Sequence, residues 1–176
     1  SVGSMAPPIV GTTLDGEAFD LAAYAGRPLV INFWGPSCVP CRDEFPLLLA
    51  KLVEHADDGF AIVGVLTDDP PQPARDFVAE FDASWPTVLD PEADLKRTYR
   101  VAGRPQTYFV DGDGIIQSIQ IGEVLDADEI IEPDLAREIA DKLPQLPADV
   151  AGVNLKRKHI FMDRWVRHGG RYPLLM

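Results

Sequence analysis

The feature that most constrains the fold of this 176-residue chain is a pair of cysteines, Cys38 and Cys41, between two different hydrophobic patterns. Before the pair, residues 29–34 are β-branched, apolar or aromatic except for one asparagine, which predicts a buried strand. Gly, Pro and Ser at 35–37 end that run. After the pair, apolar residues recur at helical spacing over about 39–55. The cysteines are therefore expected where a buried strand passes into a helix.

Cysteines in that position are suited to redox chemistry. The free N–H groups and the positive dipole end of a helix N-terminus favour the thiolate over the thiol. Cys41 follows Cys38 by about one helical turn, close enough to form a small disulfide ring with it. We therefore interpret the pair as a redox centre that is attacked, oxidised and reduced again.

Other interpretations of the pair are weaker. A zinc site needs four ligands, and the candidates His55, His159 and His168 lack ligand spacing to one another. A purely structural disulfide in so short a ring would constrain the unfolded chain very little. The loop acids Asp68 and Asp69 make a poor metal site, and we expect them to be solvated. We expect no metal and no cofactor other than the disulfide.

Length and charge limit the classes of function. The length suits one domain with a sizeable core, and no apolar stretch approaches a membrane-spanning helix. The formal net charge of −12 argues against general nucleic-acid binding, which needs a basic surface. Residues 1–150 hold 27 acidic and 10 basic side chains, whereas residues 151–176 hold 1 acidic and 6 basic. We therefore predict a domain at 1–150 and a basic C-terminal extension at 151–176.

The rest of the chain completes an α/β pattern. Residues 60–66 predict a second buried strand, and the helix before it makes a parallel β–α–β unit. Asp-Gly pairs predict a hairpin around 15–16 and another between strands at 106–110 and 115–121. Further elements are expected at about 20–25, 73–81, 92–99 and 128–143 (helical) and at 85–89 (extended). These elements predict a central mixed sheet flanked by helices.

A proline stands at the entrance of the strand at 106–110. Proline is tolerated at the start of a strand, and the bond between Arg104 and Pro105 can be cis or trans. The residues alone favour the trans isomer because it is the commoner one.

Together these residues resemble the thioredoxin superfamily and, within it, the TlpA/ResA-like thiol–disulfide oxidoreductases. The resemblance covers roughly residues 6–143 and depends on motifs that follow the family's order. They are Asn32-Phe33-Trp34 before the cysteines, Arg42-Asp43-Glu44-Phe45-Pro46 on the helix, Phe60–Leu66, Trp85–Asp90, and Pro105–Asp111 followed by Gly114. The resemblance implies a thioredoxin-like fold and a thiol–disulfide oxidoreductase that works through the cysteine pair.

Three residues are expected to carry the catalysis. Cys38, exposed at the helix start, is expected to be the attacking thiolate, and Cys41 the buried resolving thiol. The resemblance implies that Glu44, on the helical face of Cys41, manages the proton of the buried cysteine. The residues alone favour a solvated surface acid at Glu44.

Substrate contacts are expected at Arg104, Pro105 and Trp34. The resemblance implies that Pro105 is cis, packs against the cysteine pair and leaves the backbone of Arg104 open to pair with a substrate strand. Arg104 can stabilise the Cys38 thiolate or an acidic substrate segment, or it can form a surface salt bridge. Trp34 suits packing better than chemistry.

The resemblance also implies a compartment and partners. Such relatives are mostly extracytoplasmic, often tethered by an N-terminal anchor, and they reduce disulfides in apocytochrome c or other exported proteins. The expected partners are therefore a disulfide-bearing protein substrate and an upstream membrane thiol donor. Cytochrome-maturation members often carry an acidic residue after the cis proline, where this chain has Gln106. Residues 1–5 contain neither a charged n-region nor an apolar h-region, so no targeting signal is predicted in them.

The basic extension mixes charges with large apolar residues at 156–167. If this segment is helical, Ile160, Phe161 and Trp165 share one stripe. We place docking on the acidic domain first, because opposite charge attracts the segment. Contact with an anionic membrane surface, contact with a partner and a disordered end are the alternatives.

Two functions of other classes stay open. A peroxiredoxin-like peroxidase needs a Pro-x-x-x-Thr/Ser-x-x-Cys loop, and the sequence around Cys38 lacks that spacing. A non-enzymatic binding module on the same fold would not need both cysteines, so their presence argues against it.

Overall fold

The computed structural model describes residues 1–56, 59–124, 159–161 and 164–166. The chain divides into two units, Ser1–Ala127 and Asp128–Met176. The domain boundary predicted after residue 150 stays a prediction, and the helix expected at 128–143 lies outside the described residues. In the described ranges, no helix is both long enough and apolar enough to cross a membrane.

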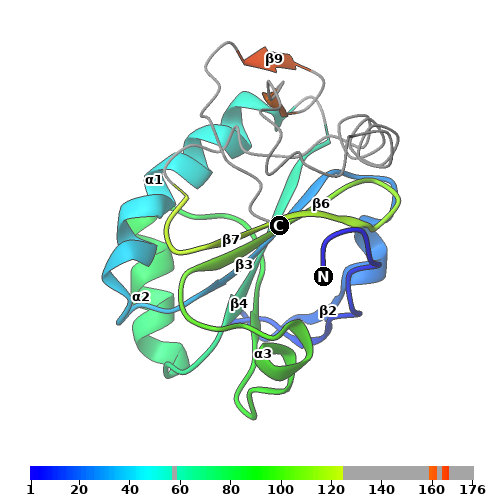
Figure 1. The fold of residues 1–176 in the computed structure, drawn as a ribbon. Coiled ribbons are helices and arrows are strands. Elements are labelled where there is room, and N and C mark those ends of the chain that lie inside the picture. Colours follow the sequence, from blue (N-terminus) through cyan, green and yellow to red (C-terminus); the bar gives the residue numbers. More distant parts are fainter. Residues whose placement is uncertain (57–58, 125–158, 162–163, 167–176) are drawn as a thin grey trace, which may run out of the picture. The chain divides into compact units, whose positions relative to one another are not determined.

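The N-terminal unit is built on a five-stranded mixed sheet in the order β5-β4-β3-β6-β7 (Figure 1). Its strands are β3 (Leu29–Trp34), β4 (Ala61–Leu66), β5 (Thr87–Leu89), β6 (Gln106–Val110) and β7 (Ile116–Ile121). The first three run parallel, whereas β6 pairs antiparallel with both β3 and β7. The predicted mixed sheet is confirmed, and its central strand β3 is the run that leads to the cysteines.

The helices of this unit lie close to their predicted positions. They are η1 (Leu21–Tyr24, a 3-10 helix), α1 (Val39–Glu54), α2 (Pro71–Phe81) and α3 (Asp94–Tyr99). Helix α1 connects the parallel strands β3 and β4, which confirms the β–α–β unit. A separate hairpin of β1 (Val10–Thr12) and β2 (Ala18–Asp20) confirms the turn predicted at 15–16.

Successive side chains of β3 point to opposite faces of the sheet, so this strand contributes to two layers. On the face covered by α3, the Phe33 ring lies 5.1 Å from that of Tyr99 and 5.7 Å from that of Tyr108, between ring centroids. Apolar residues from the N-terminal segment, its hairpin and the sheet strands complete this cluster, including Ile9, Phe19, Leu29, Ile31, Val63 and Val65. This layer is the part of the core remote from the cysteines.

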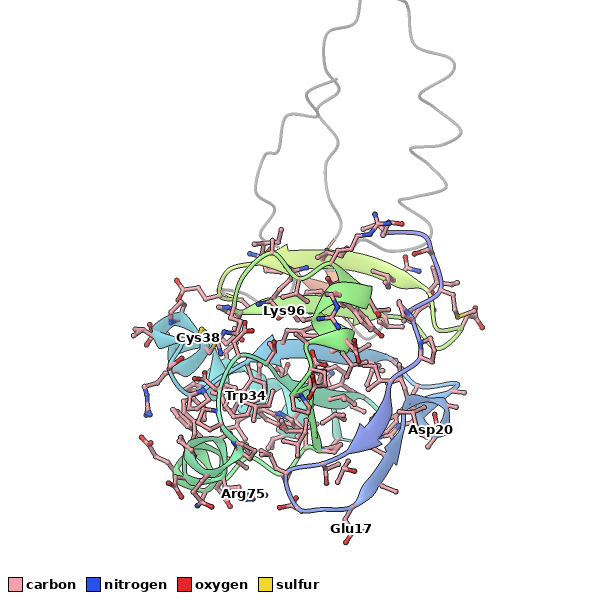
Figure 2. All side chains as sticks on the ribbon, turned by 90° about the horizontal axis from the view of Figure 1, so that it is seen from below. Glu17, Asp20, Trp34, Cys38, Arg75 and Lys96 are labelled. Carbon is pink, nitrogen blue, oxygen red and sulfur yellow. A yellow bond between two sulfur atoms is a disulfide. The ribbon has the colours of Figure 1, made fainter. Side chains whose placement is uncertain are left out.

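Helices α1 and α2 cover the opposite face (Figure 1). There the Trp34 ring lies 4.8 Å from Phe45 on α1 and 5.0 Å from Phe77 on α2, between ring centroids. Figure 2 shows Trp34 in the interior and Cys38 near the edge of the unit. Because Asn32 is two positions before Trp34, it faces α1 as well. The alternation of β3 thus brings one polar side chain beneath the cysteine helix.

In the C-terminal unit, the described residues form a short antiparallel hairpin of β8 (His159–Phe161) and β9 (Arg164–Val166). Ile160 and Trp165 are register partners in this hairpin. The helical stripe considered for this segment is therefore wrong at these six positions. β-Branched and aromatic residues favour strands, which accounts for the difference.

Candidate active site

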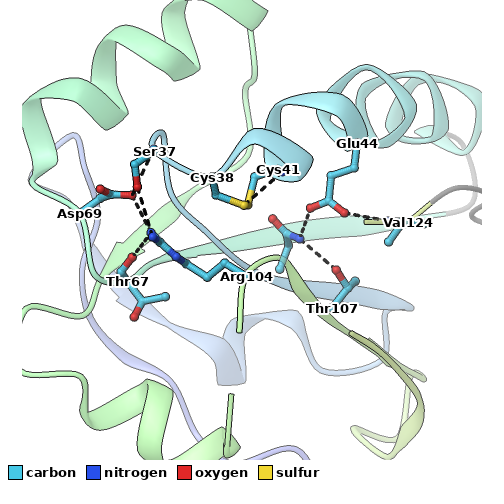
Figure 3. The surroundings of a disulfide bond; sticks show 10 residues. Ser37, Cys38, Cys41, Glu44, Thr67, Asp69, Arg104, Thr107 and Val124 are labelled. Carbon is cyan, nitrogen blue, oxygen red and sulfur yellow. Dashed lines mark hydrogen bonds and ion pairs between the residues drawn. A yellow bond between two sulfur atoms is a disulfide. The ribbon is translucent and has the colours of Figure 1, made fainter. Parts of the chain in front are cut away.

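The two cysteines form a disulfide at the start of α1, with 5.2 Å between their Cα atoms (Figure 3). Cys38 is the N-cap of the helix, and its Sγ accepts a hydrogen bond from the backbone N–H of Cys41 at 3.2 Å. Pro40 lies in the first turn, where a missing N–H leaves no helical hydrogen bond unmade. Cys38 is 8% exposed, whereas Cys41 is fully buried. The prediction that Cys38 is exposed is therefore wrong, because the loop and helix around it leave only a small part of its surface accessible. It is still the more accessible of the two cysteines, so it is the one that a substrate can reach.

Glu44 lies one turn beyond Cys41 and is 1% exposed. Its Oε1 accepts a hydrogen bond from Asn32 Nδ2 at 2.8 Å, and its Oε2 accepts one from the Val124 N–H at 3.0 Å. Burial raises the pKa of Glu44 to about 7, against the opposing effect of these two hydrogen bonds. The solvated surface acid favoured by the residues alone is therefore wrong. A carboxyl group with this pKa exchanges its proton near neutral pH.

Asn32 joins the helix to the strand beside it. Its Nδ2 donates to both Glu44 Oε1 and Thr107 Oγ1, the latter at 2.9 Å, and its Oδ1 is buried without a partner among the described residues. Sequence reasoning did not assign Asn32 or Thr107 to the site. Asn32 is the polar interruption of an apolar strand, and Thr107 is its register partner on β6, so their positions held a usable signal.

Arg104 takes part in a salt bridge rather than an open cationic site. Its Nη1 donates to Asp69 Oδ2 and to the Thr67 carbonyl, each at 2.6 Å. Its Nη2 donates to Ser37 Oγ at 3.2 Å. Of the alternatives considered for Arg104, the structure therefore shows the salt bridge, and contact with a thiolate or substrate stays a prediction.

The expectation that the two loop acids after β4 are solvated is wrong, because both form ion pairs. Asp68 pairs with Lys96 at 2.5 Å, and Asp69 pairs with Arg104. Their partners lie about 30 residues away in the sequence, so no local pattern pointed to these pairs. In the described part of the chain, no group of three or more His, Cys, Asp or Glu side chains is arranged to hold a metal ion.

Pro105 follows a cis peptide bond from Arg104, as the resemblance implied and against the preference of the residues alone. Pro105 is buried, and its carbonyl accepts a hydrogen bond from the N–H of Gly122 at 2.9 Å. Its contact with the cysteine pair stays a prediction. Trp34 is fully buried between α1 and α2, so it reaches a substrate only if its neighbours move.

Known proteins resemble this chain over the same region. The model of the AhpC/TSA family matches residues 2–119. The thiol-disulfide oxidoreductase ResA of Bacillus thuringiensis subsp. konkukian is 30% identical over 120 residues, which cover 68% of this chain and 69% of that protein.

Solved structures agree with these matches. One from Chlorobium tepidum, which carries the name thiol:disulfide interchange protein DsbE, has a TM-score of 0.67 and 26% identity, covering 81% of this chain and 98% of that one. A secreted Mycobacterium tuberculosis disulfide oxidoreductase has a TM-score of 0.59 and 25% identity, and the match covers 78% of this chain and 96% of that one. The predicted thioredoxin-like fold and the resemblance to ResA-like proteins are confirmed.

Proposed function

Since this chain belongs to the AhpC/TSA family and is a thiol–disulfide oxidoreductase, we propose that it works outside the cytoplasm and reduces disulfides of exported proteins. The observation that carries the mechanism is the contrast between the two ends of the disulfide. Cys38 is the N-cap of the helix and keeps 8% of its surface exposed, whereas Cys41 is fully buried on the side of α1 that also holds Glu44 (Figure 3). This contrast supports different roles for the two cysteines.

In the first step, the Cys38 thiolate attacks one sulfur of the substrate disulfide. A mixed disulfide forms between Cys38 and the substrate, and the second substrate sulfur leaves as a thiolate. The helix N-terminus favours this step because it stabilises the thiolate of Cys38 before attack.

In the second step, Cys41 resolves the mixed disulfide. Glu44 takes the proton of the Cys41 thiol, and the resulting thiolate attacks the Cys38 sulfur. The substrate leaves with both sulfurs reduced, and the chain holds the Cys38–Cys41 disulfide seen here. Two electrons have then passed to the substrate, whose two thiolates take up one proton from Glu44 and one from solvent. A dithiol donor must restore the two electrons to the Cys38–Cys41 disulfide.

Substrate contact is assigned to the loop that ends in the cis proline. The backbone of Arg104 pairs with an extended substrate segment beside the cis Pro105. The Arg104 side chain holds this loop to the loop before α1 through its hydrogen bond to Ser37. Trp34 supports this surface from below by packing against α1.

The compartment and partners are proposed from the relatives. The Mycobacterium tuberculosis structure carries the word secreted in its name, which supports a role outside the cytoplasm. A membrane thiol carrier is the proposed electron donor, and apocytochrome c is one candidate substrate. The basic extension at 151–176 is proposed to dock on the acidic domain, and binding of the full chain to anionic but not neutral vesicles would favour a membrane contact instead.

The direction of electron flow is tested by equilibrating the full chain with glutathione and measuring the fraction of Cys38–Cys41 disulfide. A reductant is expected to have a potential near that of thioredoxin, about −270 mV. A value near that of the oxidant DsbA, about −120 mV, would contradict the proposal. Consumption of hydrogen peroxide without a disulfide substrate would favour the peroxidase, and failure to reduce insulin would favour the binding module.

A further inference from the structure

Beside Cys38, the side chains of Ser37, Asp69 and Arg104 form a connected group, called here the Asp69 cluster (Figure 3). A single oxygen, Asp69 Oδ2, accepts hydrogen bonds from Arg104 Nη1 at 2.6 Å and from the Ser37 hydroxyl and N–H at 2.8 and 3.3 Å. The Ser37 hydroxyl in turn accepts from Arg104 Nη2 at 3.2 Å. The cluster thus ties together the loop before α1, the loop after β4 and the loop before β6.

The Asp69 cluster is packed into the protein rather than spread on its surface. The side chains of Arg104 and Asp69 are 17% and 10% exposed, against 30% and 40% for the neighbouring pair Lys96–Asp68. Gly35 makes the close approach possible, because a Cβ atom there would overlap both the guanidinium and the carboxylate. The absence of a side chain at Gly35 therefore leaves the space that the ion pair fills.

Both members of the pair are charged over the range in which a thiol titrates. Arginine side chains are always charged in proteins. Burial alone would raise the pKa of Asp69, but hydrogen bonds from Ser37 and Arg104 outweigh it and hold the pKa below its usual value. Both charges are bound to Ser37, the residue before Cys38, one positive and one negative. Their opposite effects on the Cys38 thiolate therefore largely cancel.

We propose that Asp69 is a positioning residue for Cys38: it holds the Arg104 guanidinium in the ion pair over Gly35 and prevents that charge from stabilising the Cys38 thiolate. A less stabilised thiolate makes the dithiol a stronger electron donor to a disulfide. The proposal deepens the proposed reductant role, but it concerns the chemistry of Cys38 itself and is measured without any protein substrate.

Other charged groups around Cys38 have their own partners or positions. Arg42 on α1 pairs with Glu80 on α2, and Asp43 on α1 is exposed. Glu44 is buried on the Cys41 side of the helix. Asp68, in the same loop as Asp69, pairs with Lys96 and so provides a matched control of equal charge.

The test measures the pKa of Cys38 in the reduced full chain, from the pH dependence of its alkylation by iodoacetamide followed by mass spectrometry. Asp69→Asn keeps the shape and hydrogen-bond acceptor of the side chain but removes its charge, so Arg104 is left unbalanced. We expect the pKa of Cys38 to fall by about one unit, the lower end of the effect of a nearby opposite charge. Arg104→Gln leaves Asp69 unbalanced and should raise that pKa.

The double variant Asp69→Asn/Arg104→Gln removes both charges, and its Cys38 pKa should return towards the wild-type value. Asp68→Asn also leaves a cation, Lys96, without its partner, but that pair is 30% and 40% exposed and is screened by solvent, so the Cys38 pKa should stay within about 0.3 unit. Shifts of opposite sign in the two single variants support the proposal. Shifts of the same sign, as a merely loosened loop would give, or no shift in Asp69→Asn, would overturn it, whatever the glutathione equilibrium shows about the reductant role.

Discussion

At the scale of single residues, the proposed resolving step depends most on the proton of Glu44. Its carboxyl group is buried beneath α1 and held by Asn32 and the Val124 N–H, and its pKa is raised to about 7. A group with that pKa is partly ionised near neutral pH, so it can both accept and return a proton. The buried Cys41 thiol has no solvent to take its proton, which gives Glu44 its proposed role.

The substitution Glu44→Gln removes that proton acceptor. We expect insulin reduction to slow by about 10- to 100-fold at pH 7, at or below the usual contribution of a positioned acid–base group. Asp43→Asn, which removes an exposed acid from the preceding position of the same helix, is the matched control and should keep the wild-type rate. Equal rates in the two variants would contradict a role for Glu44 in proton transfer.

At the scale of elements, the strand β3 and the helix α1 could be predicted because their hydrophobic patterns are long and unambiguous. The site between them could be predicted only in part. The local sequence predicted the position of the two cysteines at a helix start. The resemblance predicted the cis bond before Pro105.

The contacts that complete the site come from distant segments. Val124 reaches Glu44 across 80 positions of sequence, and Asp69 reaches Arg104 across 35. Such contacts depend on how the strands are ordered in the sheet, which no local pattern records. The hairpin of β8 and β9 shows that local patterns also fail when a segment is short. Its few apolar residues fit both the helical period and the strand period, so the sequence could not distinguish the two.

A substitution in the loop between β3 and α1 tests the packing of that element. Gly35→Ala places a Cβ atom where the Arg104 guanidinium and the Asp69 carboxylate now lie, and these side chains must move. We expect the free energy of unfolding to fall by about 1–3 kcal/mol, the usual cost of overpacking. Gly103→Ala is the control, because its Cβ atom would have no neighbour within 4 Å. Similar stability of the two variants in urea unfolding would show that the pair is loosely held.

At the scale of the whole molecule, Glu44 makes stability depend on pH. Its pKa is raised from 4.5 to about 7 in the folded state, so the folded state binds this proton more tightly than the unfolded state. The stabilisation that this proton gives to the folded state is fully present below pH 4.5 and is lost as the pH rises through about 7. A pKa shift of this size changes the free energy of unfolding by about 3 kcal/mol.

Urea unfolding of the oxidised chain at several pH values measures this contribution. The difference in unfolding free energy between Glu44→Gln and wild type should change by about 3 kcal/mol in favour of the variant between pH 4 and pH 8. A fixed cost from the altered hydrogen bonds of glutamine shifts all points equally and leaves the slope unchanged. A difference that is constant with pH would show that Glu44 titrates at its ordinary pKa.

The division of labour between the two cysteines is the central claim, and trapping of a substrate tests it most directly. Reduced Cys41→Ser and Cys38→Ser variants of the full chain are mixed with a disulfide-bearing protein, and the adducts are mapped by mass spectrometry. Because Cys38 attacks and Cys41 resolves, Cys41→Ser should hold the substrate on Cys38, and Cys38→Ser should hold none. Substrate bonded to Cys41, or no adduct with either variant, would contradict the account.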